Sequence, residues 1–331
     1  MKIAIRADSS SKVGTGHINR CITLAKQFKK RNINVIFISR SDKGNINKNI
    51  IKSGFRLVTV HRKKKNILYD SKKTNYYIKK LNIDFILIDN NFINYSWEKK
   101  IDTSCKIILL KDFLNRKTLC QYYINYHNIK KINYDKKFLI HKNCVKFYGP
   151  KYSIIKPINI KKRIKPLKNI FIFMGGVDNK NVSSKIISIL KSSNFINFNI
   201  KVMIGEKNLR KKIIIKQIKK LKNFSYVSGK YKDLYNFFQN SNFIIINAGV
   251  SMYENLAFGN NSLIIAQSDE HRKILKNYSG LNLFNYINNI KKLKKKYLID
   301  LLKKKKKISE SNNYFDTMGA SRIAKYFSRL K

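Results

Sequence analysis

Residues 2–28 read KIAIRADSSSKVGTGHINRCITLAKQF, and this stretch decides the fold. Its first six residues predict a short strand, and the apolar side chains from Ile18 to Phe28 recur at helical spacing. The glycines at positions 14 and 16 permit a tight turn between the two. A strand, a glycine turn and a helix in this order indicate the opening unit of a parallel α/β sheet.

His17 falls in the first turn of that helix, beside backbone N–H groups that have no intrahelical partner. Such groups suit an anionic ligand. The positive end of the helix dipole disfavours an imidazolium, so we expect a neutral ring that accepts a proton at pH 7. His17 is therefore the candidate catalytic base, and plain structural packing is the alternative interpretation.

Strand-like and helix-like runs alternate in two rounds along the chain. The first round predicts strands at residues 2–7, 35–38, 57–60, 85–88, 107–110, 122–124 and 145–148. The second round predicts strands at residues 170–173, 200–204, 224–227, 243–246 and 263–266. This alternation predicts an α/β protein with two doubly wound, Rossmann-like domains facing a cleft, which the loops at the carboxyl ends of both sheets would line.

The three prolines mark the boundary between these domains. Pro150, Pro157 and Pro166 all lie in one short basic stretch. Because proline denies the backbone regular pairing and stiffens a connection, residues 150–167 are expected to form an ordered linker. The expected domains are therefore residues 1–149 and 168–331, which agrees with two domains in a chain of 331 residues.

The charge balance is extreme, with 71 Lys and Arg against 18 Asp and Glu, for a net charge of +53. At face value this indicates a protein that binds polyanions. The excess is mostly Lys, however, and it accompanies Ile, Asn, Tyr and Phe, which all have AT-rich codons. Genomic drift toward Lys is the simpler origin. The basic runs lack the interleaved aromatic residues of a base-stacking platform, so we expect no specific nucleic-acid partner and only weak attraction to anionic surfaces.

The cysteines and histidines indicate neither disulfides nor a metal site. The four cysteines form no CxxC pair, as is typical of reduced core thiols, and the five histidines lack metal-ligand spacing. No apolar run approaches the ~18 residues of a membrane span, and the chain opens without a signal peptide. We therefore expect a cytoplasmic protein without a metal.

Polar residues follow the first, fourth and fifth predicted strands, at Asp8, at residues 89–91 (DNN) and at Asp112. They converge with His17 at one sheet edge. Asp8 is expected to orient His17, to bind a sugar hydroxyl or to cap the turn. Arg20 shares the helix face of His17 and would meet a phosphate or a surface carboxylate.

Two turns in the second half suit a nucleotide diphosphate. Residues 174–178 (MGGVD) join a strand to a helix that begins near Asn181, and the paired glycines let a phosphate approach the helix N-terminus. Residues 247–251 (NAGVS) form the second turn, and Glu254 follows on its helix, where it would accept both ribose hydroxyls. The alternatives are a simple turn, and a glutamate that only satisfies the helix dipole.

The chain resembles the UDP-sugar hydrolases of the pseudaminic acid pathway, which have the two-domain GT-B fold. The matching segments are residues 6–17 (RADSSSKVGTGH) with Arg20, 112–116 (DFLNR), 148–152 (YGPKY), 174–178 (MGGVD), 249–254 (GVSMYE) and 319–322 (GASR). The opening motif and YGPKY are the more specific. The glycine turns and Glu254 are shared with many GT-B glycosyltransferases, including MurG-like ones.

The resemblance implies hydrolysis of UDP-2,4-diacetamido-2,4,6-trideoxy-altropyranose to UDP and the free sugar, without a metal or other cofactor, with His17 as the catalytic base. The implied substrate-binding residues are Arg6, Asp8, Gly16, Arg20 and Asn181. The implied UDP-binding residues are Met174, Gly175, Gly176, Gly249, Ser251, Met252 and Glu254. Two positions depart from the family, Asn91 in place of the usual Tyr and His271 in a segment where an Asn-Gln pair is common, and they bear on the identity of the sugar.

Two other functions are compatible with these residues. A GT-B glycosyltransferase would use the same second domain to bind its UDP-sugar donor. A basic binding protein for nucleic acid or an anionic membrane would use the net charge, although no recognised nucleic-acid motif is present.

Overall fold

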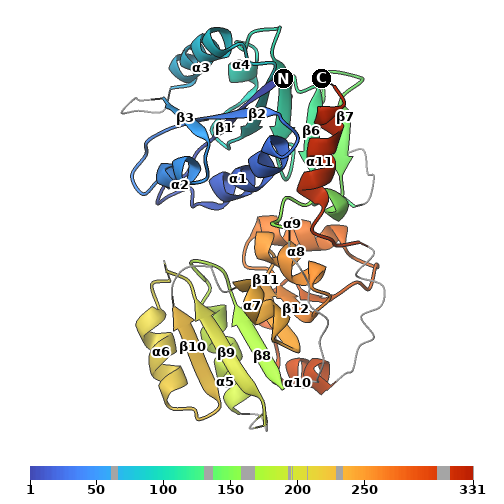
Figure 1. Cartoon of the computed structure of the whole chain (residues 1–331). Helices are drawn as coiled ribbons and strands as arrows, with labels where there is room; N and C mark the ends of the chain where they lie inside the picture. Colours follow the sequence, from blue (N-terminus) through green and yellow to red (C-terminus); the bar gives the residue numbers. More distant parts are fainter. Residues whose placement is uncertain are drawn as a thin grey trace. The chain divides into compact units, whose positions relative to one another are not determined.

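The computed structural model describes residues 1–60, 66–129, 137–157, 168–192, 195, 197–206, 208–228, 234–303 and 314–330. The chain forms two compact units (Figure 1). Unit 1 is Met1–Lys156 together with Thr317–Lys331, and unit 2 is Pro157–Asp316. Each unit holds one parallel sheet with helices on both faces, which confirms the predicted fold class.

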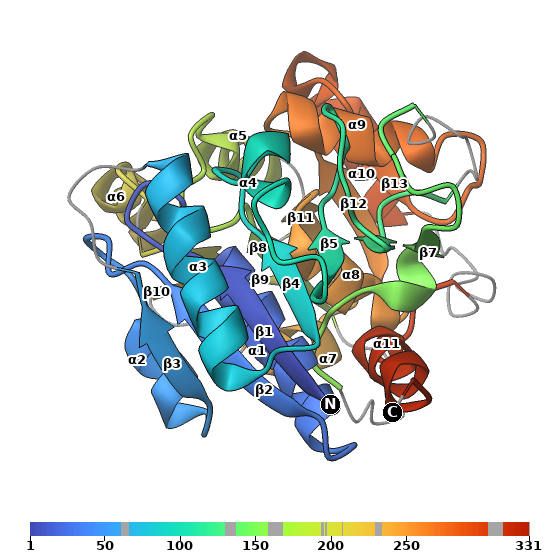
Figure 2. The same cartoon turned by 90° about the horizontal axis from the view of Figure 1, so that it is seen from above.

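In the described part of unit 1, seven parallel strands follow the order β3-β2-β1-β4-β5-β6-β7 (Figure 2). The strands are β1 (Lys2–Ala7), β2 (Asn34–Ser39), β3 (Arg56–Thr59), β4 (Phe85–Asp89), β5 (Lys106–Leu110), β6 (Tyr122–Asn125) and β7 (Val145–Tyr148). The strand order reverses between β1 and β4. In doubly wound sheets this switch point is where ligands bind, beyond the carboxyl ends of the strands.

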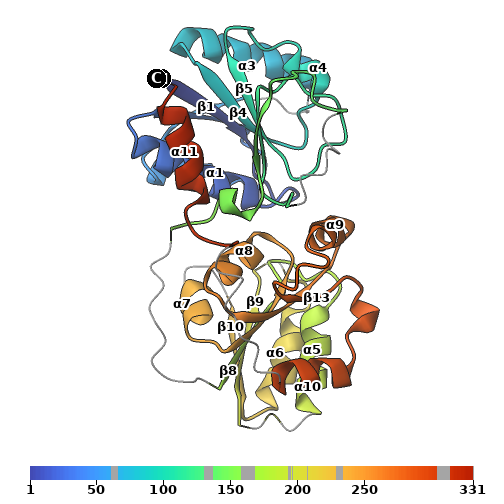
Figure 3. The ribbon, with the colours of Figure 1, turned by 90° about the vertical axis from the view of Figure 1, so that its right-hand side faces the viewer.

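Helices cover both faces of the unit 1 sheet (Figure 3). They are α1 (Gly16–Lys29), α2 (Asn47–Lys52), α3 (Ile67–Leu81), α4 (Tyr95–Glu98), the 3-10 turn η2 (Pro150–Tyr152) and α11 (Gly319–Ser328). Helices α3 and α4 pack Ile78 and Trp97 onto one face with Ala4 of β1, and α1 and α11 lie on the other. The strands are buried on both sides, as parallel strands usually are.

The chain ends in unit 1, so the prediction that residues 317–331 belong to the second domain is wrong. Phe327 of α11 packs its ring against Phe28, Phe85 and Tyr122, with ring centroids 5.0 to 5.9 Å apart. The apolar face of α11 needs a partner, and it finds one on α1 rather than on the preceding unit. Sequence order alone does not show such a return.

The predicted linker is only partly described. Pro150 opens η2 within unit 1, and the boundary between the units falls between Lys156 and Pro157. Residues 158–167, including Pro166, lie outside the described residues. Gly319 at the start of α11 meets the chain just after η2. A Cβ there would lie 2.3 Å from the Ser153 carbonyl oxygen, so only glycine permits this approach.

In the described part of unit 2, six parallel strands follow the order β10-β9-β8-β11-β12-β13. The strands are β8 (Asn169–Phe173), β9 (Asn199–Ile204), β10 (Phe224–Ser228), β11 (Phe243–Asn247), β12 (Asn261–Ile265) and β13 (Asn285–Ile287). Every strand predicted from the sequence is present in the two sheets within two residues of its expected bounds. The three-residue strand β13 and the single-turn helix α4 were not predicted, because neither is long enough to show a period.

The helices of unit 2 also divide between two faces (Figure 3). They are α5 (Val182–Lys191), α6 (Lys211–Lys219), α7 (Leu234–Gln239), α8 (Val250–Ala257), α9 (Asp269–Asn277), the 3-10 turn η4 (Ile290–Lys292) and α10 (Lys295–Lys303). Helices α5, α6 and α10 share one apolar cluster with the strands. Helix α7 packs Phe238 against Phe171 of β8 on the opposite face.

Candidate active site

The segment between β1 and α1 holds His17 in the first turn of the helix, as predicted. Ser10 and Gly14 close the turn with two backbone hydrogen bonds, of 3.3 Å from the Ser10 amide and 2.8 Å from the Gly14 amide. Gly14 has a φ of 87°, which a side chain would strain. Helix α1 begins at Gly16, whose position in the first turn is exposed.

A buried carboxylate orients the His17 ring. Nδ1 of His17 lies 2.6 Å from Oδ1 of Asp89, and Asp89 ends β4 as the register partner of Ala7 in β1. Burial would raise the pKa of Asp89, but Arg20 and His17 together hold it below its usual range. An ionised carboxylate only accepts hydrogen bonds, so Nδ1 is the nitrogen that donates to Asp89, and Nε2 is the nitrogen that carries the lone pair in a neutral ring.

Nε2 is the nitrogen left for chemistry. Among the described residues it has no hydrogen-bond partner, and the His17 side chain is 19% exposed. The helix N-terminus beside the ring could be inferred from the sequence, whereas the Asp89 carboxylate could not. A ring fixed at one nitrogen and partly exposed suits a proton acceptor better than a packing residue.

Arg20 is a positioning residue rather than a substrate ligand, which corrects the prediction. Its Nε and Nη2 donate to Asp89 over 2.7 and 2.6 Å, and its Nη1 donates to Asp112 over 3.1 Å and to the Tyr126 hydroxyl over 3.0 Å. The side chain is buried. Because its donors are engaged inside unit 1, Arg20 has none left for a phosphate. Of its two predicted partners it meets the carboxylate, since the side chain of Asp112 is 40% exposed.

Arg6 and Asp8 form a second buried network. Arg6 is fully buried and bonds Asp8 through Nη1 over 2.5 Å and Asp70 through Nη2 over 2.7 Å. The Trp97 indole N–H also donates to Asp70, over 2.9 Å. Arg6 therefore holds Asp8 and Asp70 in place from inside unit 1. Because it is fully buried, the prediction that it binds substrate directly is wrong.

Asp8 holds two loops together. Its carboxylate accepts from the Arg40 amide over 2.8 Å and from the Asn90 side chain over 2.7 Å, besides Arg6. Burial would raise the pKa of Asp8, but the charge of Arg6 and these hydrogen bonds lower it. The predicted contact from Asp8 to His17 is absent from the described residues, where Asp89 takes that role. With its oxygens engaged, Asp8 shapes the loops after β2 and β4.

We expect Arg6→Met to lower the free energy of unfolding by about 3 kcal/mol, because two buried carboxylates would lose their guanidinium partner. Urea denaturation followed by the fluorescence of Trp97, the single tryptophan, measures the change. The matched control is Arg56→Met on the exposed side of β3, for which we expect less than about 0.5 kcal/mol. Equal losses in both variants would contradict a structural role for the Arg6 network.

Sequence reasoning missed two residues at this sheet edge, Tyr126 and His127. Both follow β6, and His127 lies with its Nε2 3.3 Å from Asp112 Oδ1. Their position after a strand end was the available signal. Asn91, which stands where the UDP-sugar hydrolases that the chain resembles usually have a Tyr, accepts a hydrogen bond from Lys111 Nζ over 3.3 Å.

The sequence predicts that the turn after β8 in unit 2 offers a helix N-terminus to phosphate. In the structure it does not. Asp178 is buried, and its carboxylate accepts from the amides of Val182 and Ser183 over 2.8 and 3.0 Å. The start of α5 is therefore capped by the chain's own anion. Asn181 precedes α5 in the left-handed conformation, with a φ of 51°.

Gly175 in this turn and Gly205 beside it are needed for close approach of the backbone. Gly175 has a φ of 82°, and a Cβ there would lie 2.9 Å from the Asn247 side-chain nitrogen. The Gly176 backbone packs against Gly205, where a Cβ would lie 2.3 Å from the Gly176 carbonyl oxygen. Met174 is buried and its carbonyl accepts from the Gln267 side chain over 2.9 Å, so its side chain belongs to the core.

The turn after β11 keeps the features predicted for anion binding. Gly249 is the N-cap of α8 and provides no side-chain cap. Among the described residues, no acceptor is bonded to the amides of Val250 and Ser251. The Met252 side chain is fully buried, so only its backbone is available to a ligand.

Glu254 lies one turn into α8 and is half-buried. Its Oε1 accepts a hydrogen bond from the Tyr235 hydroxyl over 2.6 Å. Burial raises the pKa of Tyr235, and the Glu254 carboxylate raises it further, so the phenol stays a donor. His271, the second departure from the family, accepts at Nδ1 from the Gln267 amide over 3.2 Å at the start of α9.

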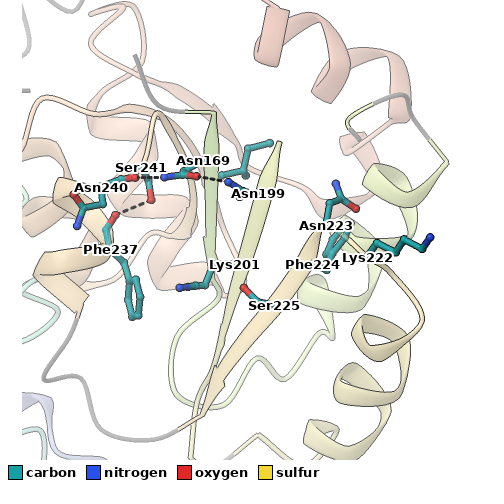
Figure 4. A pocket seen from close by; sticks show the side chains of 11 residues that line it. Asn169, Asn199, Lys201, Lys222, Asn223, Phe224, Ser225, Phe237, Asn240 and Ser241 are labelled. Carbon is teal, nitrogen blue, oxygen red and sulfur yellow. Dashed lines mark hydrogen bonds between the residues drawn. The ribbon is translucent and has the colours of Figure 1, made fainter. Parts of the chain in front are cut away.

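A cavity of about 360 Å³ lies at the other edge of the unit 2 sheet, by the amino ends of β8, β9 and β10 (Figure 4). Its asparagines bond within the protein, Asn169 to the Asn240 carbonyl over 2.8 Å and Asn199 to Asn169 over 3.2 Å. Ligands of doubly wound sheets bind at the carboxyl ends of the strands, so this cavity is separate from the α8 site.

The described residues contain neither a membrane-spanning helix nor a metal-binding cluster. None of the helices there combines the length and the apolar character that crossing a membrane requires. No group of three or more His, Cys, Asp and Glu side chains in the same residues is arranged to hold a metal ion.

Comparison with known proteins gives distant relatives, and no family model matches the chain. An uncharacterized protein of Methanocaldococcus jannaschii is 29% identical over 320 residues, and the match covers 91% of this chain but 62% of that longer protein. A UDP-2,4-diacetamido-2,4,6-trideoxy-beta-L-altropyranose hydrolase of Campylobacter jejuni is 27% identical over 261 residues, which is 77% of this chain and 88% of the relative.

Solved structures show the same fold at low identity. Acinetobacter baumannii MurG superposes with a TM-score of 0.68 at 11% identity, over 99% of this chain and all of MurG. The UDP-GlcNAc 2-epimerase of Neisseria meningitidis, bound to UDP-GlcNAc, gives 0.66 at 11% identity over the whole of both chains. These likenesses establish a MurG-like GT-B fold, as expected from the sequence.

Proposed function

We propose that this chain is an enzyme that hydrolyses a UDP-linked 2,4-diacetamido-2,4,6-trideoxy sugar to UDP and the free sugar, in the biosynthesis of a nonulosonic acid such as pseudaminic acid. The observation that carries the proposal is the hydrogen bond between His17 and the buried Asp89. The name of the Campylobacter jejuni relative supports the reaction and the class of substrate.

In the proposed reaction, His17 acts as the general base. Nε2 takes a proton from water as the water oxygen bonds to the anomeric carbon. The bond from that carbon to the β-phosphate oxygen breaks, and UDP leaves with the electron pair. Asp89 holds the Nδ1–H and stabilises the imidazolium that forms. A base of this kind contributes roughly 10² to 10⁴ in rate.

The leaving group explains why a single base suffices. Glycosidases use paired carboxylates because a sugar alkoxide leaves poorly without an acid. A nucleotide diphosphate leaves readily once its charge is held. We assign the diphosphate to the amides of Val250 and Ser251 at the start of α8, and not to α5, because Asp178 caps α5.

The contacts to the ribose and to the sugar are assigned from the exposure and charge of the residues near the two turns. Glu254 lies on the same helix as the amides assigned to the diphosphate, and its carboxylate, which accepts from Tyr235 at Oε1, is assigned to the ribose hydroxyls. The exposed backbone of Gly16, beside His17, is assigned to the sugar. Asn91 stands where the family that the chain resembles usually has a Tyr, and it accepts a hydrogen bond from Lys111, so we place the selection among acylated sugars at this pair.

Product analysis in ¹⁸O-labelled water tests the proposal. The enzyme is incubated with a panel of UDP-linked diacetamido sugars, and the products are identified by mass spectrometry. We expect free sugar and unlabelled UDP, since attack at the anomeric carbon leaves the phosphate oxygens untouched. The reaction is expected to proceed unchanged in EDTA, because the proposed mechanism uses no metal.

Each other outcome names a different function. Label in UDP would mean attack at phosphorus and would contradict the role of His17. Release of UDP only with an added acceptor would identify a glycosyltransferase, which the fold also accommodates. A sugar isomer that remains linked to UDP would identify an epimerase.

A further inference from the structure

Helix α6 lies beside β10 at the edge of the unit 2 sheet (Figure 1), and the side chains on its outer face are exposed. Ile214 and Ile218 on its inner face are buried in the core of the unit. At 3.6 residues per turn, the opposite face collects positions 212, 213, 216, 219 and 220, and Leu209 lies in the turn before the helix. We call this set the α6 stripe: Leu209, Lys212, Ile213, Lys216, Lys219 and Lys220, all of them exposed.

The apolar members of the stripe are the unusual feature. Leu209 is 94% exposed, more than any other large apolar side chain in the described residues, and Ile213 is 56% exposed. Drift toward lysine explains lysines scattered over a whole surface. It does not explain two exposed aliphatic side chains in the same stripe as four lysines, with Leu209 before its first lysine and Ile213 between Lys212 and Lys216.

We propose that the α6 stripe docks the protein onto an anionic lipid bilayer. Lysine ammonium groups bind the headgroup phosphates, and each lysine adds attraction near a negative surface. Leu209 and Ile213 enter the boundary between headgroups and acyl chains, where their burial is favourable. The four lysine stems lie beside them and keep their charges at the headgroup level.

The same stripe is poorly suited to nucleic acid. Leucine and isoleucine gain nothing from phosphates, and the stripe has no aromatic side chain on which a base would stack. The proposal also stands apart from the catalytic one, because α6 carries none of the candidate site residues.

Vesicle sedimentation with the full chain tests this surface. The probes are vesicles with about 30% phosphatidylglycerol in phosphatidylcholine, and vesicles of phosphatidylcholine alone, in about 0.15 M salt, where screening acts within ~8 Å. We expect binding to the anionic vesicles only. Leu209→Ser with Ile213→Ser is expected to weaken binding about tenfold, and Lys216→Glu with Lys220→Glu at least tenfold.

Matched variants separate the stripe from the overall charge. Lys72→Glu with Lys73→Glu makes the same charge change on the exposed face of α3, and Ile51→Ser removes an aliphatic side chain that is 61% exposed on α2. We expect both to bind within twofold of the parent, with unchanged melting temperatures for all variants.

Three outcomes would overturn the proposal. The first is an equal loss of binding in the α3 lysine pair, which would mean attraction by net charge alone. The second is full vesicle binding by the double serine variant. The third is the absence of vesicle binding at this salt concentration, together with tight binding to single-stranded RNA that depends on Lys216 and Lys220.

Discussion

His17→Asn is expected to lower kcat about a thousandfold and to leave the affinity for UDP within twofold. The asparagine amide still donates to Asp89, so the buried carboxylate keeps a partner, but no atom replaces Nε2 as a base. The measurement is UDP release by a coupled assay, with the Kd for UDP obtained by calorimetry. The variant thus removes the chemistry while preserving the network beneath it.

Glu254→Gln is the control for this prediction, because it should lower the affinity for UDP rather than kcat. It removes the charged acceptor assigned to the ribose, so we expect the Kd for UDP to rise about tenfold. A His17→Asn enzyme that released UDP at the parent rate would exclude His17 as the base. Loss of UDP affinity in the same variant would mean that His17 belongs to the nucleotide site.

The strands and the residues at their ends were predictable because they follow from local patterns. His17 could be placed from a strand, two glycines and a helical period, all within 28 residues. The carboxylate that holds its Nδ1 could not be placed in this way. Asp89 is 72 positions away along the chain, and only the pairing of β1 with β4 brings the two together. The register of β1 against β4 does not follow from the sequence, so Asp8, which is nearer to His17 along the chain, was the residue named for the role.

Arg6 shows a second limit of prediction from the sequence. The resemblance to UDP-sugar hydrolases implied that Arg6 binds substrate. The side chain is buried because Asp70 on α3, 64 positions away, and Asp8 neutralise it. Paired burial of charges is a tertiary property, and no local period signals it.

Asp178 was predictable but was misread. It follows paired glycines and lies four residues before the first residue of α5, where a carboxylate caps a helix. Attention to the glycines led to a phosphate site instead. The α8 turn has no such carboxylate, and that difference between two glycine turns is visible in the sequence.

Asp89→Asn is expected to lower kcat about a hundredfold while leaving the affinity for UDP unchanged. An asparagine can present its N–H to the ring, which favours the wrong tautomer, and it does not stabilise an imidazolium. The change also leaves Arg20 with less negative charge inside unit 1, so the melting temperature should fall. Steady-state kinetics below that temperature separates the two effects.

Acid titration of the same variant distinguishes a charged partner from a packing residue. The pKa of Asp89 lies below its usual range in the folded protein. Its ionised form therefore contributes stability that is complete above the unfolded pKa of ~3.9 and is lost as the pH falls toward the folded value. The difference in melting temperature between the parent and Asp89→Asn should shrink below about pH 4.

The matched control for Asp89→Asn is Asp70→Asn. Asp70→Asn neutralises a buried carboxylate that pairs with Arg6, just as Asp89→Asn neutralises one that pairs with Arg20. Asp70, however, is not a partner of His17. We expect a comparable loss of stability with kcat within tenfold of the parent. If both variants lost activity equally, the effect would come from a loosened unit 1. If Asp89→Asn kept its full kcat, His17 would need no carboxylate to hold its proton in place.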